Sequence, residues 1–194
     1  MKIGFVVEGD IDKLVIEQSL SCIPCPPNLQ TMYYTYEGRR AVAEMRRGCW
    51  ALAEQKCGRV IVFQDRNSRK ECAPSIARRI REDLSRHYPK IERVVTVCVV
   101  EQEVESWILA DAQCIEEVTG TRVPRRRTEG VDDAKEKLKD HLEEAFPKAY
   151  KVTSPTDREC IVKFIGRFDL KRASEYNRSA DRFLKKCREI VGLS

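Results

Sequence analysis

The sequence predicts an α/β protein in which helices flank a mostly parallel four-stranded sheet. Four short runs rich in apolar and β-branched residues are typical of buried strands, at residues 2–7, 30–36, 59–65 and 93–100. Stretches with helical character separate these runs, and alternating strands and helices produce parallel strands joined by right-handed crossovers. Ligands of such sheets bind at the carboxyl ends of the strands, so the residues that end each strand are the first to consider for function.

Local signals support each helix between the predicted strands. The first begins before Leu14 and is stopped by the proline-rich sequence at residues 22–28. Gly38 and Gly58 bound a second helix over residues 39–56. A third helix, from about residue 74 to 87, has an apolar stripe every fourth residue, and a fourth begins near Trp107, which we expect to pack in the core.

The C-terminal part of the chain is predicted to be helical. Residues 121–131 are polar, basic and without periodicity, so they are expected to form an exposed loop. Amphipathic patterns then predict helices over residues 132–146, 155–165 and 179–191. We therefore expect an α/β core at residues 1–112 and a loop with a helical extension at residues 113–194. A chain of 194 residues with 42% hydrophobic content fits one structural domain in which the extension packs on the core.

Composition predicts a soluble, cytoplasmic protein that does not interact with membranes. The chain opens directly on a strand-like run, without the pattern of a signal peptide, and it contains no long apolar stretch. Nine cysteines, an odd number spread over the whole chain, fit reduced thiols better than a disulfide framework. Cys22 and Cys25 have the spacing of half a zinc site, but no second close-spaced pair exists, so structural zinc is not expected.

The charge distribution makes a polyanion a candidate partner. Lys and Arg number 36 against 31 Asp and Glu, and the excess is concentrated in arginine-rich clusters. Such clusters can contact phosphates, but a net charge of +5 is modest, and solvated helix faces explain many of them equally well. A protein partner is also compatible with this surface, and the oligomeric state is left open.

Acidic residues end three of the four predicted strands. Glu8 follows the first strand, Asp65 ends the third, and Glu101 follows the fourth, with Glu105 shortly after and Asp10 of second rank. Neighbouring carboxylates repel one another, so their convergence is favourable when Mg²⁺ or Mn²⁺ binds among them. A single acid at a strand end is more often a turn residue or a helix cap. On that ground we expect Asp12 to cap the first helix and Glu103 to face solvent.

Three segments resemble a known family. Residues 5–12, FVVEGDID, resemble the strand and Glu-Gly-x-x-Asp opening of the Toprim superfamily, which includes topoisomerases, primases, nucleases, recombination mediators and small maturation ribonucleases. Residues 60–67, VIVFQDRN, stand where that superfamily has a strand followed by Asp-x-Asp. Residues 101–111, EQEVESWILAD, are similar to the Glu-x-Trp-Leu-Leu-Ala-Asp signature of a small stand-alone Toprim-like family of unknown function, and the helical C-terminal part is comparable as well.

The resemblance implies roles for the acidic residues and their neighbours. Glu8 would be the general acid or base of phosphoryl transfer, while Asp65, Asn67 and one of Glu101 and Glu105 would hold Mg²⁺ or Mn²⁺. The flanking cations would hold phosphates or nucleic acid: Arg66, Arg69 and Lys70. Asn67 departs from the family pattern, because a neutral amide replaces the second Asp. Either a downstream Glu restores that charge, or metal binding is weakened, or catalysis is lost.

These observations lead to three hypotheses about function. The first is Mg²⁺-dependent phosphodiester chemistry, namely nuclease-type cleavage of DNA or RNA at a Toprim-like acidic site. The second is a non-catalytic Toprim-like module that binds nucleic acid or a protein. The third, a small-nucleotide phosphohydrolase or transferase, is disfavoured because no glycine-rich phosphate loop occurs. Motifs of dinucleotide-binding folds and of serine hydrolases are also missing from the sequence.

Overall fold

A computed structural model of the protein describes residues 1–36, 41–66, 71–153 and 155–192. Within these ranges, four parallel strands form one sheet in the order β2-β1-β3-β4. The strands are β1 (Lys2–Val7), β2 (Gln30–Thr35), β3 (Arg59–Asp65) and β4 (Val95–Val100). The predicted α/β class and the four-stranded parallel sheet are therefore confirmed, with strand ends within two residues of the expected ones.

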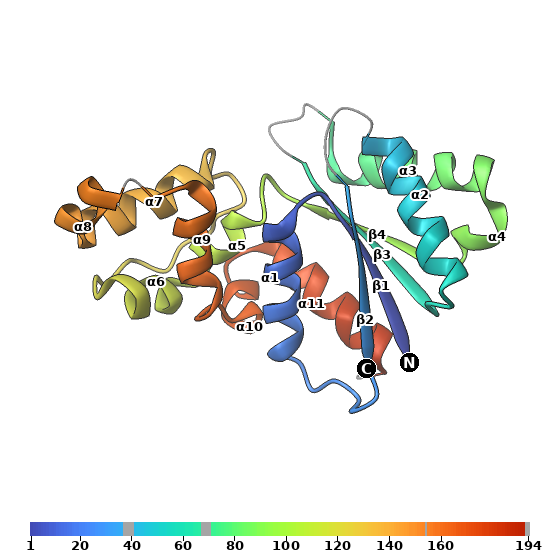
Figure 1. The fold of residues 1–194 in the computed structure, drawn as a ribbon, viewed down its shortest axis with the longest axis horizontal. Helices are drawn as coiled ribbons and strands as arrows, with labels where there is room; N and C mark the ends of the chain where they lie inside the picture. Colours follow the sequence, from blue (N-terminus) through green and yellow to red (C-terminus); the bar gives the residue numbers. More distant parts are fainter. Residues whose placement is uncertain (37–40, 67–70, 154, 193–194) are drawn as a thin grey trace.

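Helices cover both faces of the sheet (Figure 1). Those of the first part of the chain are α1 (Asp10–Ser21), α2 (Ala41–Glu54), α3 (Ala73–His87) and α4 (Pro89–Glu92). The helices α2 and α3 pack on one face, over Val6, Val60 and Val62. On the other face lie α1 and the last helix, α11 (Arg178–Val191), where they contact side chains such as Phe5 and Phe63. The α2 helix approaches β1 so closely that a Cβ atom at Gly4 would lie 2.9 Å from Leu52 Cδ1.

The remaining helices are drawn to the left of the sheet in Figure 1, and all but the first of them belong to the C-terminal extension. They are α5 (Glu105–Ala110), α6 (Ala112–Thr119), α7 (Ala134–Ala145), α8 (Pro147–Thr153), α9 (Asp157–Ile165) and α10 (Leu170–Ser174). Four helices were not predicted separately: α4, α6, α8 and α10. They contain four to eight residues, too few for a periodic apolar pattern, and side-chain caps help to define α6 and α10. For example, Asp169 accepts hydrogen bonds from the backbone N–H groups of Lys171 and Arg172.

The extension shares its core with the sheet. One cluster of buried apolar side chains includes residues from Ile3 in β1 to Val191 in α11. Trp107 is fully buried, as predicted, and its ring lies 5.4 Å from Phe63 in β3 and 5.3 Å from Phe183 in α11, measured between centroids. Aromatic contacts of this kind stabilise beyond their buried area, so α5 and α11 are anchored directly to the sheet.

The strand order places a reversal between β1 and β3. From β1 the chain crosses outward to β2 along one face, and from β2 it returns over the other face to β3. The loops that leave β1 and β3 therefore diverge to opposite faces of the sheet. In open parallel sheets the crevice at such a reversal, outside the carboxyl ends of the strands, is where ligands bind.

Among the described residues, no helix is both long enough and apolar enough to cross a membrane. All nine cysteines are free. The thiols of Cys22 and Cys25 donate hydrogen bonds to the carbonyl oxygens of Gln18 and Leu20, at 3.3 and 3.6 Å.

Candidate functional site

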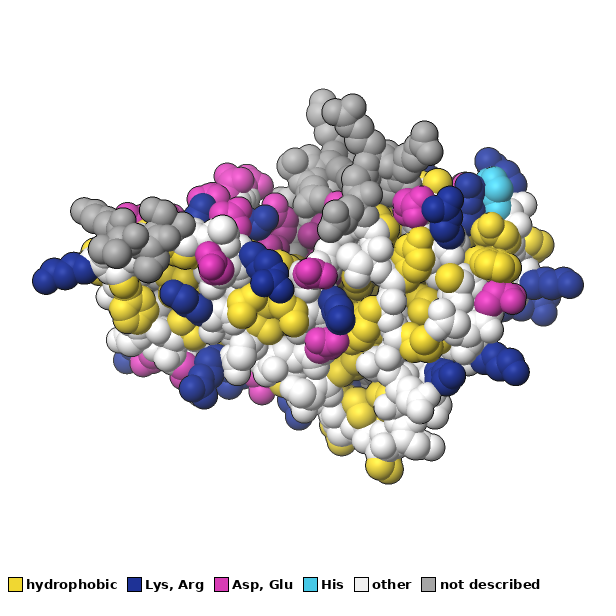
Figure 2. Space-filling view, viewed as in Figure 1, with side chains coloured by type: hydrophobic (Ala, Val, Ile, Leu, Met, Phe, Trp, Pro, Cys, Tyr) yellow, Lys and Arg dark blue, Asp and Glu magenta, His cyan; other side chains and the backbone are white. Residues whose placement is uncertain are grey.

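An acidic hollow lies at the carboxyl ends of β1 and β3. Its volume is about 460 Å³, and six carboxylates line it together with two cations. The acidic residues are Glu8, Asp10, Asp12, Asp65, Glu103 and Glu105, and the cations are Lys135 and Arg158. Figure 2 shows acidic side chains gathered along the upper edge of this face of the molecule. Glu8 and Asp65, from two separate strands, thus face one cavity, and Asp10 and Glu105 join them there.

Strand ends position the two central acids. Asp65 is the last residue of β3 and pairs in register with Val100 of β4. Glu8 follows β1 directly, and its Oε2 accepts a 3.4 Å hydrogen bond from Nε2 of Gln64. The Gln64 side chain is 2% exposed, and its Oε1 accepts a 3.2 Å hydrogen bond from the Tyr36 hydroxyl. This buried amide orients Glu8 toward the end of the neighbouring strand.

Two further acids in the hollow are buried, and the position of a third differs from the sequence prediction. Asp12 is 6% exposed and accepts a 2.9 Å hydrogen bond from the backbone N–H of Gly9, the N-cap residue of α1, so it supports the helix start from inside the helix while also lining the hollow. Glu105, the first residue of α5, is 5% exposed. The expectation that Glu103 faces solvent is wrong. Its Oε2 is buried and has no hydrogen-bond partner in the structure, because the turn between β4 and α5 folds this side chain into the hollow.

Burial and mutual repulsion disfavour the charged form of three of these carboxyl groups. Burial raises the pKa of Asp12 to about 7, with smaller contributions from the charges of Glu105 and Glu8. Burial also raises the pKa of Asp65 well above its ordinary value, and the neighbouring charges of Asp12 and Glu105 add to this shift. The pKa of Glu105 is raised as well, chiefly by burial. The protein alone therefore does not compensate the negative charge gathered here.

The acidic hollow contains oxygens of the kind that hard divalent cations bind. Asp65 Oδ1 and Glu103 Oε2 are buried and have no hydrogen-bond partner among the described residues, and carboxylate oxygens are the ligands that Mg²⁺ prefers. As the side chains stand, however, the described part of the chain contains no group of three or more His, Cys, Asp or Glu side chains that could hold a metal ion. A cation in the hollow would therefore have to draw these carboxylates closer together.

Glu101 does not lie in the acidic hollow. Its Oε2 accepts a 2.5 Å hydrogen bond from Nη1 of Arg66, and its Oε1 accepts a 3.1 Å hydrogen bond from Nη2 of Arg182 in α11. Two guanidinium groups compensate this carboxylate, so the structure does not bring it together with Asp65 as a metal ligand. Asn67, Arg69 and Lys70, for which the sequence predicts metal or phosphate contacts, lie outside the described residues.

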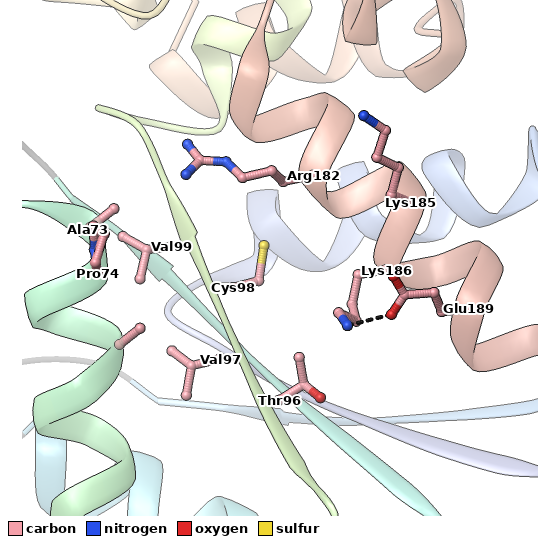
Figure 3. Close-up of a pocket in the computed structure, with 11 residues that line it drawn as sticks. Ala73, Pro74, Thr96, Val97, Cys98, Val99, Arg182, Lys185, Lys186 and Glu189 are labelled. Atoms are coloured by element: carbon pink, nitrogen blue, oxygen red, sulfur yellow. Dashed lines mark hydrogen bonds and ion pairs between the residues drawn. The ribbon is translucent and has the colours of Figure 1, made fainter.

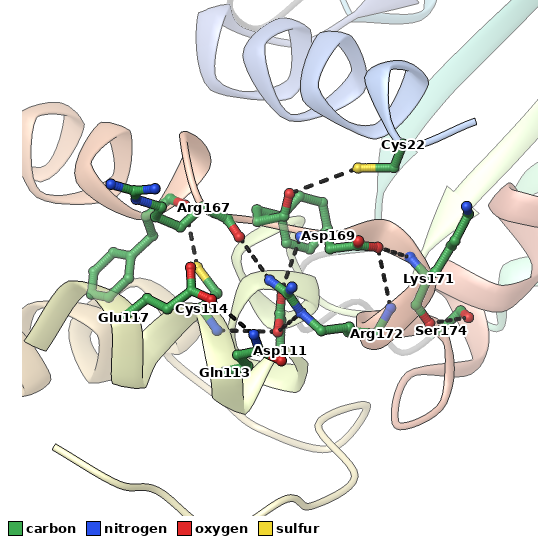
Figure 4. Close-up of polar contacts among 12 residues, drawn as sticks. Cys22, Asp111, Gln113, Cys114, Glu117, Arg167, Asp169, Lys171, Arg172 and Ser174 are labelled. Carbon is green, nitrogen blue, oxygen red and sulfur yellow. Dashed lines mark hydrogen bonds and ion pairs between the residues drawn. The ribbon is translucent and has the colours of Figure 1, made fainter. Parts of the chain in front are cut away.

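Most of the run at residues 105–111 has a structural role. Trp107 Nε1 donates a 2.8 Å hydrogen bond to Ser179 Oγ, and Ser106 Oγ accepts one of 3.2 Å from Asn177 Nδ2. Asp111 is 1% exposed and receives two hydrogen bonds from the guanidinium of Arg172, at 2.7 and 2.9 Å (Figure 4). These contacts join α5 to the C-terminal helices, and in this run only Glu105 faces the acidic hollow.

The sequence did not single out two cations that line the hollow. Lys135 lies in α7 and Arg158 in α9, both within the C-terminal extension. The Lys135 charge lowers the pKa of Glu105 and so opposes the effect of burial. No local pattern marks either residue, because α7 and α9 carry many charged residues and only the packing of the extension selects these two.

The stability of the metal-free protein is expected to fall as pH rises from about 4 to about 7. Over this range the unfolded chain releases the Asp12 proton, at an ordinary pKa of 3.8, while the folded chain retains it up to about pH 7. Raising the pH therefore favours unfolding, by up to about 1.4 kcal/mol per pH unit for this group. Urea unfolding in EDTA measures the effect as the difference between the unmodified protein and Asp12→Asn. Parallel pH profiles of the two proteins would contradict it.

The candidate site is thus defined by its own geometry, at the reversal point of a parallel sheet. Three carboxyl groups with raised pKa values and two buried oxygens without partners are gathered in one hollow. Comparison with known proteins adds nothing to this description: no family model matches the chain, and neither does a curated protein or a solved structure.

Proposed function

We propose that the acidic hollow binds Mg²⁺ or Mn²⁺ and that the protein cleaves phosphodiester bonds of DNA or RNA, as a Toprim-like metal-dependent nuclease. The observation that carries the proposal is the buried, unpartnered Oδ1 of Asp65 among five other carboxylates at the reversal point of the sheet. A structural role does not explain an arrangement that raises the pKa of its own members. A bound cation would remove the repulsion and satisfy the free oxygens.

The Toprim-like assignment is part of the same proposal. Acids follow the first, third and fourth strands in chain order, as the resemblance implies, and those strands are parallel and adjacent in the sheet. The acids that follow the fourth strand are placed differently from the sequence prediction. Glu103 and Glu105 face the hollow, while Glu101 is paired with arginines.

All the charged groups in the hollow except Asp10 have a role in this proposal. Asp65, Glu105 and Glu103 would hold the cation, together with Asp12 in its ionised form. The cation would neutralise the phosphate charge and lower the pKa of a bound water. Glu8, held by Gln64, is placed to accept a proton from the attacking water or to donate one to the leaving oxygen. Lys135 and Arg158 provide positive charge for the phosphate, which a bare carboxylate cluster would repel.

An assay with purified protein tests the proposal. Single- and double-stranded DNA and RNA are incubated with Mg²⁺ or Mn²⁺, and with EDTA as a control. We expect metal-dependent cleavage of at least one substrate, reduced by about 100-fold or more in Glu8→Gln, because a positioned general acid or base contributes about that much. Asp140→Asn, an exposed carboxylate change in α7, is the matched control and is expected to cleave normally. Binding of nucleic acid without any cleavage would instead support the non-catalytic module.

A further inference from the structure

A second hollow, which we call the arginine hollow, lies next to the acidic one. Its volume is about 720 Å³, and four arginines line it: Arg66, Arg127, Arg178 and Arg182. The chain itself joins the two sites. Asp65 lines the acidic hollow, and the next residue, Arg66, lines the arginine hollow. Likewise, Glu103 lines the acidic hollow and Glu101 lines the arginine hollow. The two hollows are thus built at the ends of the same pair of strands, β3 and β4.

Several guanidinium donors in the arginine hollow remain available to a ligand. Arg66 Nε is buried and has no hydrogen-bond partner within the part of the chain that the structure describes. Arg127 is exposed and forms no hydrogen bond or ion pair with any described residue. Arg178 Nε is 4.0 Å from Glu129 Oε1, at the limit of an ion pair. A buried donor without an acceptor is costly, and a phosphate oxygen is an acceptor that suits a guanidinium.

The acids of the arginine hollow are already occupied by cations or backbone groups. Glu101 joins the guanidinium groups of Arg66 and Arg182 and so fixes both at the ends of the strands. Asp181 pairs with Lys185 at 2.7 Å, and Glu129 accepts the backbone N–H of Arg178 at 2.8 Å. These carboxylates hold the arginines in place, and Arg127 and the free edge of Arg66 remain for an anion.

The loop that carries Arg127 is anchored. The next residue, Thr128, is fully buried, and its hydroxyl donates a 2.8 Å hydrogen bond to the carbonyl oxygen of Ser106 and accepts one of 3.0 Å from Asn177 Nδ2. Its backbone N–H donates to the Tyr176 carbonyl oxygen. Arg127 is therefore presented from a fixed point, which lowers the entropy lost when it binds a ligand.

Basic side chains continue beyond the arginine hollow along α11. Arg182 also lines a neighbouring hollow beside β4, the edge strand of the sheet, together with Lys185 and Lys186. Figure 3 shows Arg182 directed from α11 toward the carboxyl end of β4, with Lys185 on the next turn of the helix. Lys185 pairs with Asp181 and Lys186 with Glu189, so the positive charge that is free for a ligand lies mainly in the arginine hollow.

We propose that the arginine hollow binds the phosphate groups of a polynucleotide that flank the phosphodiester at the acidic hollow. This inference rests on the proposed function, but it can be tested by binding alone, without any measurement of cleavage. A polynucleotide fits better than a mononucleotide, because the residues that line the arginine hollow include no aromatic or apolar side chain to hold a base. Recognition would be through the phosphate backbone and independent of sequence.

Binding in EDTA tests the inference separately from catalysis. The anisotropy of short fluorescent single-stranded DNA, single-stranded RNA and duplex DNA is measured over a range of salt concentrations. The double variant Arg127→Ala/Arg178→Ala removes two phosphate contacts. We expect its slope of log K against log salt to become less steep by about 0.7 per arginine for single strands, or about 0.9 for duplex. Arg188→Ala, an exposed arginine of α11 outside the hollow, is the matched control and should keep the slope of the unmodified protein.

Three results with the polynucleotide alone would overturn the inference. They are an unchanged slope in the double variant, an equal loss in Arg188→Ala, and failure of the unmodified protein to bind any polynucleotide at low salt. Competition by pyrophosphate or a mononucleotide at concentrations similar to the polynucleotide would also overturn it, in favour of a small-ligand site. Metal-dependent cleavage that is lost in Glu8→Gln would still stand in each case, so the two proposals fail separately. Circular dichroism of both variants confirms that they are folded.

Discussion

Asp65→Asn is expected to stabilise the metal-free protein at about pH 8 and, at the same time, to abolish metal-dependent cleavage. In the unmodified protein, ionisation of Asp65 is opposed by burial and by the charges of Asp12 and Glu105. Asparagine has nearly the same shape and carries no charge, so the free energy of unfolding should rise by about 1–3 kcal/mol in EDTA. Loss of a metal ligand should lower the cleavage rate by about 10²- to 10⁴-fold, because a catalytic cation contributes several kcal/mol.

Two measurements separate this result from a general effect of the substitution. Urea unfolding in EDTA gives the change in stability, and the same series with Mg²⁺ should stabilise the unmodified protein more than Asp65→Asn, because only the former offers the full ligand set. Asp140→Asn, exposed in α7, should change neither stability nor cleavage. If Asp65→Asn destabilises the protein in EDTA, the carboxylate has a structural partner and the proposed metal site is wrong.

Asp111→Ala is expected to destabilise the protein by about 3–5 kcal/mol without any direct effect on the acidic hollow. The Asp111 side chain is fully buried, and it accepts hydrogen bonds from Arg172 and from the backbone N–H groups of Cys114 and Asp169 (Figure 4). Removing one partner of a buried ion pair leaves the other uncompensated, and here two backbone donors also lose their acceptor. The substitution would loosen the junction between α5, α6 and α10.

Urea or thermal unfolding measures this effect, with an exposed pair as control. Glu82→Ala removes the ion pair with Arg78 on α3, whose side chains are 65% and 74% exposed, and should cost less than about 1 kcal/mol. Equal effects of the two substitutions would show that the Asp111 contacts contribute no more than a surface ion pair. Any cleavage activity of Asp111→Ala, measured well below its melting temperature, should remain close to that of the unmodified protein.

The sheet was largely predictable from the sequence because its signals are local. Each strand is a short run of apolar, β-branched residues; residues 59–65, for example, are buried by α2 and α3 on one face of the sheet and by α1 and α11 on the other. The short helices were not predictable in the same way. The α6 helix is separated from α5 by Asp111, whose conformation depends on its distant partner Arg172, 61 residues later in the chain.

The candidate site was predictable in part. The acids at the strand ends correctly indicated the edge of the sheet at which the site lies. The structure places Glu8, Asp10, Asp65 and Glu105 in one hollow at that edge. The choice among the acids that follow β4 was not predictable. The three acids Glu101, Glu103 and Glu105 stand at alternate positions in the sequence. The conformation of the turn after β4 determines which of them lines the acidic hollow with Asp65 and which lines the arginine hollow.

The sequence by itself determined the class of fold, the order of its strands and of the longer helices along the chain, and the edge of the sheet at which acids collect. Periodicity and strand-end residues are properties of short segments, so they need no knowledge of distant contacts. The tertiary structure decided the strand order in the sheet and the pairing of Glu101 with Arg66 and Arg182. It also decided that Lys135 and Arg158 line the acidic hollow. Those outcomes depend on the packing of a helical extension onto the sheet, which joins residues too far apart in the chain for any local pattern to relate.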